Sequence, residues 1–120
     1  MIVVDASALL EVRLRTPVAA AVGPVVVPAG TVIVPVIRRY AANGEISSER
    51  GRLALDDFAD FRVHRYSHDV LLPRVWDLRH NLTACDAVYV ALAEALDATL
   101  LTRDRRLAAA AGHHARIDVV

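Results

Sequence analysis

Three aspartates stand where a short apolar run gives way to a predicted helix. Asp5 follows MIVV, Asp86 lies in the first turn of the helix in NLTACDAVYVALAEAL, and Asp104 comes shortly after ATLLT. In a parallel sheet, residues just beyond the carboxyl ends of the strands gather at one edge. Carboxylates that converge there are suited to Mg²⁺, which prefers oxygen ligands and leaves positions open for water and substrate phosphate. A cation held in this way can activate water and stabilise a phosphodiester during cleavage.

Each of these aspartates also has a purely structural interpretation. Asp5 can cap a helix at 6–15, a role that stabilises a helix by about 1 kcal/mol. Asp86 fits a capping box that begins at Thr83, and Asp104 can cap a helix that begins at Arg105. An unrelated small α/β protein with three capped helices therefore remains open as an alternative to a metal site.

The elements that must position these residues alternate along the chain. We expect strands at 2–4, 61–66, 98–102 and 116–119, and helices at 6–15, 35–43, 48–59, 69–79, 83–96 and 105–111. Residues 17–37 are the least predictable segment, because four of the five prolines fall there and disfavour a long helix. The alternation indicates an α/β fold with a mainly parallel central sheet and helices on both faces.

Length and composition are typical of one ordered domain spanning residues 1–120, since 55% of the residues are hydrophobic and 23% are charged. No apolar run approaches the roughly 20 residues of a membrane span. The first residues also lack a signal-peptide pattern, so a cytoplasmic protein is expected. Fourteen basic and fourteen acidic residues balance, and the bulk charge does not indicate nucleic-acid binding. All fourteen basic residues are arginines, which excludes P-loop and Schiff-base chemistry.

Two expectations concern the core. The only cysteine, Cys85, cannot form an intrachain disulfide, and its apolar helical surroundings predict a buried, inert thiol. In the helix predicted at 69–79, Leu72, Val75 and Trp76 are expected to face the core.

The chain resembles the PIN-domain ribonucleases of the VapC toxin type, over nearly its whole length. The matching stretches are VVDASALLE, RRYAANGEISSERG, NLTACDAVYVALAEAL and LLTRDRRLA. The resemblance implies a PIN-like three-layer α/β sandwich and a Mg²⁺-dependent endoribonuclease, with Mn²⁺ as a plausible substitute. It also implies a cognate antitoxin, an RNA substrate and a homodimer. Asp5 and Asp86 would be the principal metal ligands and Asp104 would complete the cluster, with Ser7 and Thr102 beside them.

The chain departs from this family at one acidic position. The family usually carries a glutamate on the helix before the Arg-Arg pair, and six residues before Arg38 the chain has Val32. Glu11 should point away from Asp5, and Glu45 follows the predicted helix end, so neither is expected to replace it. The departure predicts weaker Mg²⁺ binding and reduced or absent cleavage. The alternative function is a catalytically impaired PIN-fold protein that dimerises and binds antitoxin without cutting RNA.

Arginines and apolar helices suggest how partners would be bound. Seven arginines are expected near the acidic site: Arg13, Arg15, Arg38, Arg39, Arg103, Arg105 and Arg106. They could hold RNA phosphates, although solvated helix faces explain each one equally well. The apolar helices at 6–15 and 35–43 are candidates for the dimer interface and for an antitoxin groove.

Overall fold

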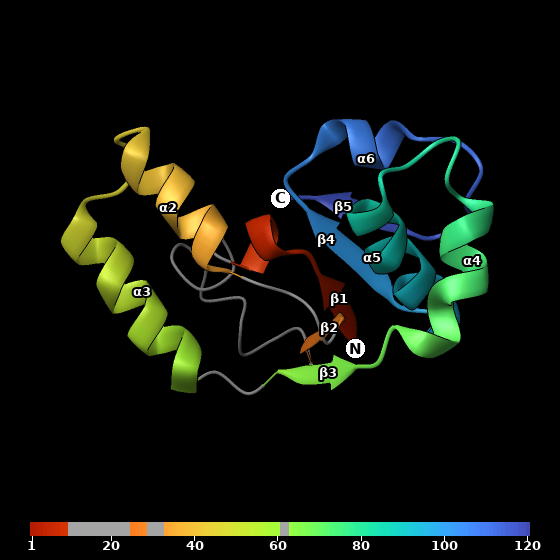
Figure 1. Ribbon diagram of the computed structural model, residues 1–120, viewed down its shortest axis with the longest axis horizontal. Coiled ribbons are helices and arrows are strands. Elements are labelled where there is room, and N and C mark those ends of the chain that lie inside the picture. Colours follow the sequence, from red (N-terminus) through yellow and green to blue (C-terminus); the bar gives the residue numbers. More distant parts are fainter. Residues whose placement is uncertain (10–24, 29–32, 61–62) are drawn as a thin grey trace.

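The computed structural model of the chain describes residues 1–9, 25–28, 33–60 and 63–120. Its five strands are β1 (Ile2–Val4), β2 (Val25–Pro28), β3 (His64–Tyr66), β4 (Thr99–Thr102) and β5 (Ile117–Val119). They form one sheet in the order β3-β2-β1-β4-β5, and all four neighbouring pairs are parallel. The expected α/β fold is confirmed, with a sheet that is wholly parallel (Figure 1).

The alternation of side chains along the strands builds two separate cores. Ile2 and Val4 of β1 belong to a cluster with Ile37 and Tyr40, whereas Val3 belongs to a second cluster with Val90. Because successive residues of a strand point to opposite faces, these clusters lie on the two sides of the sheet. The three-layer arrangement follows from this division, with the sheet as the middle layer.

Two helices, α2 (Val34–Ala42) and α3 (Ser48–Asp60), contribute to the first core. Pro35 occupies the first turn of α2, where a missing N–H is tolerated. The helix ends at Asn43, and Gly44 follows with a positive φ of 74° that suits glycine. The Ser47 hydroxyl accepts a hydrogen bond from the Arg50 N–H at the start of α3, as expected of a cap. Both predicted helices are confirmed.

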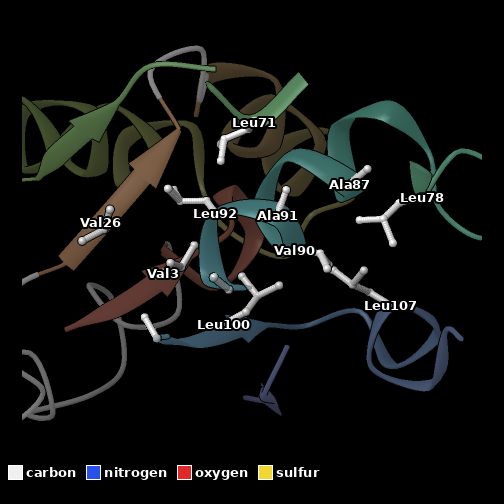
Figure 2. Close-up of a cluster of buried hydrophobic side chains, with 12 residues drawn as sticks. Val3, Val26, Leu71, Leu78, Ala87, Val90, Ala91, Leu92, Leu100 and Leu107 are labelled. Atoms are coloured by element: carbon white, nitrogen blue, oxygen red, sulfur yellow. The ribbon is translucent and has the colours of Figure 1, made fainter. Parts of the chain in front are cut away.

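The second core is built around α5 (Ala84–Ala95), which covers the other face of the sheet (Figure 2). Five of its residues are buried: Ala87, Val90, Ala91, Leu92 and Ala93. They pack against Val3 and Leu100 of the central strands, and α6 (Arg105–Ala109) adds Leu107. The small alanines allow this helix to lie close to the sheet.

The segment predicted as one helix at 69–79 is a 3₁₀ turn, η2 (Asp69–Leu71), followed by the short helix α4 (Leu72–Asp77). Leu71 and Leu78 are the buried residues of this region, so Leu72 and Trp76 face outward and are 55% and 67% exposed. The expectation that these two residues enter the core is wrong. Trp76 instead lies beneath the Arg79 guanidinium, whose Cζ is 4.5 Å from the ring centroid.

Cys85 also differs from its prediction. It is exposed, because it lies in the first turn of α5, ahead of the residues that the sheet covers. The buried residues of α5 begin at Ala87, further along the helix.

Strand β2 was not predicted, since Pro24 and Pro28 leave only a short run of valines between them. Pro28 is the last residue of β2 and lies beside Tyr66 of β3. The pairing of β2 with β1 ends earlier, at Val26. A proline is tolerated at such a strand end because its missing N–H interrupts no ladder. At the start of the chain, residues 6–9 are helical as expected, and the rest of that predicted helix lies outside the described residues.

The strands predicted at 98–102 and 116–119 are confirmed with shorter bounds, as β4 and β5. The strand predicted at 61–66 is confirmed at His64–Tyr66, as β3, and residues 61–62 lie outside the described part of the chain. The described helices include none long and apolar enough to cross a membrane.

An ion pair between the largely buried Glu94 carboxylate and the partly exposed Arg74 connects elements on the α5 side of the sheet. Glu94 of α5 accepts hydrogen bonds from Arg74 Nε at 2.7 Å and Arg74 Nη2 at 3.1 Å, and one from the His114 backbone N–H at 3.0 Å. Burial disfavours the charged carboxylate, but the bonds from Arg74 and His114 outweigh it and hold the pKa of Glu94 below its ordinary value. The same pair raises the pKa of Arg74. One carboxylate thus joins α4, α5 and the loop before β5.

We therefore expect Glu94→Gln to lower the free energy of unfolding at neutral pH by about 1–2 kcal/mol, since Arg74 is left partly unpaired. The lowered pKa means that this stabilisation is present above pH 4.5, the ordinary value for the group, and is lost as the pH falls through the lower folded-state pKa. Urea unfolding at several pH values measures both effects, with a shallower acid-side loss in the variant.

The matched control for this prediction is Asp97→Asn, which removes the charge from an exposed ion pair with Arg116. Exposed pairs contribute little, so a change below about 0.5 kcal/mol is expected. Equal effects of the two substitutions would contradict the role assigned to Glu94.

Candidate active site

Asp5 begins the candidate site at the carboxyl end of β1. Its side chain is largely buried, with 8% of the residue exposed. The oxygen Oδ1 accepts hydrogen bonds from the Ser7 hydroxyl at 2.6 Å and the Ala8 backbone N–H at 2.8 Å. The bond from Ala8 is the predicted helix cap, so capping and site formation are compatible functions of one carboxylate.

Thr102 connects Asp5 to the neighbouring strand. Its hydroxyl donates to Asp5 Oδ2 and accepts a 3.0 Å bond from the Asp104 backbone N–H. Thr102 is fully buried, and β1 and β4 are paired immediately before it, with Val4 beside Leu101. The parallel pairing therefore fixes the position of Asp5 relative to the turn that carries Asp104.

Asp104 caps α6, as the structural interpretation predicted. Its Oδ1 accepts bonds from the backbone N–H groups of Arg106 at 2.8 Å and Leu107 at 3.4 Å. The other oxygen, Oδ2, has no protein partner within the described part of the chain. One carboxylate oxygen thus holds the helix start while the other stays available.

Asp86 is the third acid, in the first turn of α5. Thr83 caps the helix by accepting the Asp86 backbone N–H at 3.2 Å. The reciprocal bond of a capping box, from the Thr83 backbone to the Asp86 carboxylate, is not formed. Across the described residues this carboxylate has neither a hydrogen bond nor an ion pair, so the predicted capping box is only half realised.

The topology places all three acids toward one edge of the sheet. Asp5 and Asp104 follow the carboxyl ends of the neighbouring strands β1 and β4. A short turn joins the end of α5 to the start of β4, so α5 runs back along the sheet and its first turn, with Asp86, lies toward the carboxyl ends (Figure 1). Hydrogen bonds link Asp5 to the turn carrying Asp104, whereas Asp86 is outside that network.

Their chemistry suits a hard divalent cation. The available groups are carboxylate and hydroxyl oxygens, which Mg²⁺ and Mn²⁺ prefer. A carboxylate accepts at about four lone-pair positions, and Asp5 uses three of them, so one remains. Among residues 1–9, 25–28, 33–60 and 63–120, no three His, Cys, Asp or Glu side chains are grouped closely enough to hold a metal ion. The type of donor atom therefore suits Mg²⁺ or Mn²⁺, although the described acids do not form a group of three. Val32 and Glu11 lie outside the described residues.

An open cavity of about 380 Å³ adjoins Asp104. Ser7, Arg39, Tyr40, Glu45, Arg103 and Asp104 line it. Glu45 reaches this cavity because the chain turns back after Gly44, and the Glu45 backbone N–H donates to the Tyr40 carbonyl at 2.9 Å. The helix end at Asn43-Gly44 was predicted, but the position of Glu45 in this cavity was not. That Glu45 does not replace the family's glutamate stays a prediction.

Of the arginines predicted near the acidic site, only some line the cavity in the part of the chain that the structure describes. Arg39 and Arg103 line it, whereas the exposed Arg38, Arg105 and Arg106 do not. Arg13 and Arg15 lie outside the described residues. The sequence did not single out this pair, because Arg39 and Arg103 are far apart in the chain and meet only across the folded structure.

Thr102→Val tests whether the buried hydroxyl organises this edge. The change keeps the shape of the side chain but leaves Asp5 Oδ2 and the Asp104 N–H without their partner. We expect the free energy of unfolding to fall by about 1–2 kcal/mol in urea titrations. Thr99→Val, at the start of the same strand, should change it by less than about 0.5 kcal/mol. Similar losses for both variants would show that the hydroxyl of Thr102 has no special role.

Comparison with known proteins places the chain among named relatives. It is 38% identical to Ribonuclease VapC12 of Mycobacterium tuberculosis over 128 residues, covering 100% of this chain and 99% of the relative. It is 42% identical to Ribonuclease VapC9 of the same species over 112 residues, covering 89% and 88% of the two chains. The alignment with VapC12 is longer than the 120 residues of this chain, so the chain lacks residues that the relative contains.

A third relative is more similar over a shorter region. The chain is 49% identical to Ribonuclease VapC1 of M. tuberculosis over 85 residues, which are 70% of this chain and 64% of the relative. The match thus spans just under two thirds of that relative's length. No protein-family model matches the chain. The parallel α/β fold, the placement of the acidic residues and the similarity to VapC12 and VapC9 along most of both chains together show that the chain belongs to the VapC family of PIN-domain ribonucleases.

Proposed function

We propose that this protein is a Mg²⁺-dependent endoribonuclease, the toxin of a toxin–antitoxin pair. The observation that carries the proposal is the buried Asp5 carboxylate, fixed at the carboxyl end of β1 and linked through the Thr102 hydroxyl to the turn bearing Asp104. Three relatives that share most of this chain are named ribonucleases. A phosphodiester in RNA is the substrate class that this acidic edge and its adjacent arginines would serve.

In this proposal Asp5, Asp86 and Asp104 supply the oxygen ligands for Mg²⁺, for which Mn²⁺ can substitute. When bound, the cation would lower the pKa of an attacking water and offset the charge that builds on the phosphate. The protein's own contribution is orientation. Ser7 and Thr102 hold the two oxygens of Asp5, and the Arg106 and Leu107 N–H groups hold one oxygen of Asp104.

The proposed partners follow from membership of the VapC family. They are a cognate antitoxin protein, RNA and a second copy of the chain, with the protein acting in the cytoplasm. An antitoxin that covers the acidic edge would prevent RNA from reaching Asp5 and Asp104. This explains how a ribonuclease would be kept inactive in the cell that makes it.

A second candidate is a PIN-fold protein that dimerises and binds antitoxin without cutting RNA. Two observations favour it. Val32 stands where the family usually has a glutamate, and the described acids do not form a complete group of three. One carboxylate fewer lowers the negative charge that attracts the cation and removes a group that could orient water.

Calorimetric titration with Mn²⁺ and an RNA cleavage assay separate these candidates. The wild-type chain should bind Mn²⁺ and cleave RNA at millimolar Mg²⁺ or Mn²⁺. Asp86→Ala should weaken Mn²⁺ binding at least about tenfold and reduce cleavage by about a hundredfold or more, since it removes a direct ligand.

The control is Asp56→Ala on α3, an exposed acid whose loss should leave both measurements unchanged. Wild-type protein that binds Mn²⁺ but leaves varied RNAs intact would favour the binding protein. Wild-type protein that binds no Mn²⁺ would contradict the metal site and the ribonuclease proposal, and it would also favour the binding protein.

A further inference from the structure

Two guanidinium groups converge on one tyrosine ring beside the acidic edge. The Cζ atom of Arg39 is 5.7 Å from the centroid of the Tyr40 ring, and that of Arg103 is 5.5 Å from the same centroid. Arg103 Nη1 also donates a 2.7 Å hydrogen bond to the Tyr40 hydroxyl. All three residues line the cavity that adjoins Asp104.

The fold holds this arrangement in place. Tyr40 is 8% exposed and belongs to the core formed by β1, α2 and α3, so its ring cannot move freely. Arg103 directly follows β4, whose last residue, Thr102, is fixed by Asp5. The tyrosine thus joins the first helical layer to the turn that carries Asp104.

The Arg39 side chain has fewer partners than that of Arg103, which donates a hydrogen bond to the Tyr40 hydroxyl. Apart from its position near the Tyr40 ring, the Arg39 side chain makes no hydrogen bond or ion pair with the residues that the structure describes. Arg39 and Arg103 line the same cavity, so an anion bound there would be attracted by both positive charges. Arginine presents a planar fork of N–H donors that matches the oxygens of a phosphate group.

The remaining cavity residues suit the rest of a nucleotide. Glu45 and Asp104 offer carboxylate oxygens that accept hydrogen bonds, and Ser7 offers a hydroxyl. A ribonucleotide carries both an anionic phosphate and neutral donors, namely its 2′-hydroxyl and the N–H groups of its base. The cavity has a volume of about 380 Å³ and is open to solvent, so a nucleotide bound in it could continue into the rest of an RNA strand.

We infer that this cavity binds one nucleotide of the RNA next to the scissile bond, with Arg39 and Arg103 holding its phosphate and Tyr40 positioning Arg103. The inference rests on the proposed ribonuclease function only in assigning the nucleotide to the substrate. The inference assigns phosphate binding to Arg39 and Arg103 in particular. The net charge of the chain, with equal numbers of basic and acidic residues, could not have indicated this.

The test is binding of a short, fluorescein-labelled single-stranded RNA to the full chain in EDTA, where metal-dependent cleavage cannot occur. Arg39→Ala should weaken binding about tenfold at low salt. It should also reduce the slope of log K against log salt concentration by about 0.7, the value for one lost phosphate contact on a single strand. Arg38→Ala, the adjacent exposed arginine on the same helix, is the matched control and should stay within about twofold of wild type.

Two further variants sharpen the test. Tyr40→Phe keeps the ring but removes the hydroxyl that positions Arg103, and should weaken binding by about threefold with unchanged thermal stability. Glu45→Gln removes a negative charge from the cavity and should tighten RNA binding by about twofold.

Equal binding by Arg39→Ala and Arg38→Ala would overturn the inference, even if the wild-type chain cleaves RNA. A selective loss in Arg39→Ala would support it, even if the wild-type chain proves unable to cleave RNA. The nucleotide site and the proposed ribonuclease activity can therefore fail separately.

Discussion

The burial of one charged side chain, Asp5, governs the functional edge of this protein. A carboxylate in a buried position must be matched by hydrogen-bond donors, and here the donors come from Ser7, Ala8 and Thr102. Thr102 is on a different strand, so satisfying Asp5 also fixes β4 against β1. The Thr102 hydroxyl in turn accepts the Asp104 N–H. The hydrogen bonds that satisfy the Asp5 carboxylate therefore also hold the turn that carries Asp104.

The two cores supply the framework for this edge. Strands β1 and β4 are covered on both faces, by the cluster containing Ile37 on one side and by α5 on the other. A one-residue slip in register would disrupt the packing of both clusters, because each residue of these strands would move to the opposite face of the sheet. The acids, the Arg39–Tyr40–Arg103 arrangement and the cavity beside Asp104 all depend on that fixed register. On this view Tyr40 serves both as a core residue and as a support for the cations around it.

Much of the fold could be predicted from the sequence, because the alternation of apolar strands with helices is strong from Ala84 onward. Asp5, Asp86 and Asp104 could be selected for the same reason, since each stands at the end of such a pattern. Strand β2 could not, because prolines interrupt its short valine run. Trp76 and Cys85 were predicted to be buried but are exposed. The apolar pattern could not show which face is buried in a helix as short as α4, or at the first turn of α5.

Four of the six residues that line the cavity were expected near the acidic site, but the cavity itself could not be predicted, because its residues meet only through tertiary structure. Arg39 and Arg103 come from opposite halves of the chain, and Glu45 reaches them through the turn at Gly44. The most direct test of the central account is a crystal structure with Mn²⁺ located by its anomalous scattering. We expect a Mn²⁺ ion bound by oxygens of Asp5 and Asp86, with Asp104 in or next to the coordination shell. An edge without Mn²⁺ at saturating concentration, or an ion held by other residues, would contradict it.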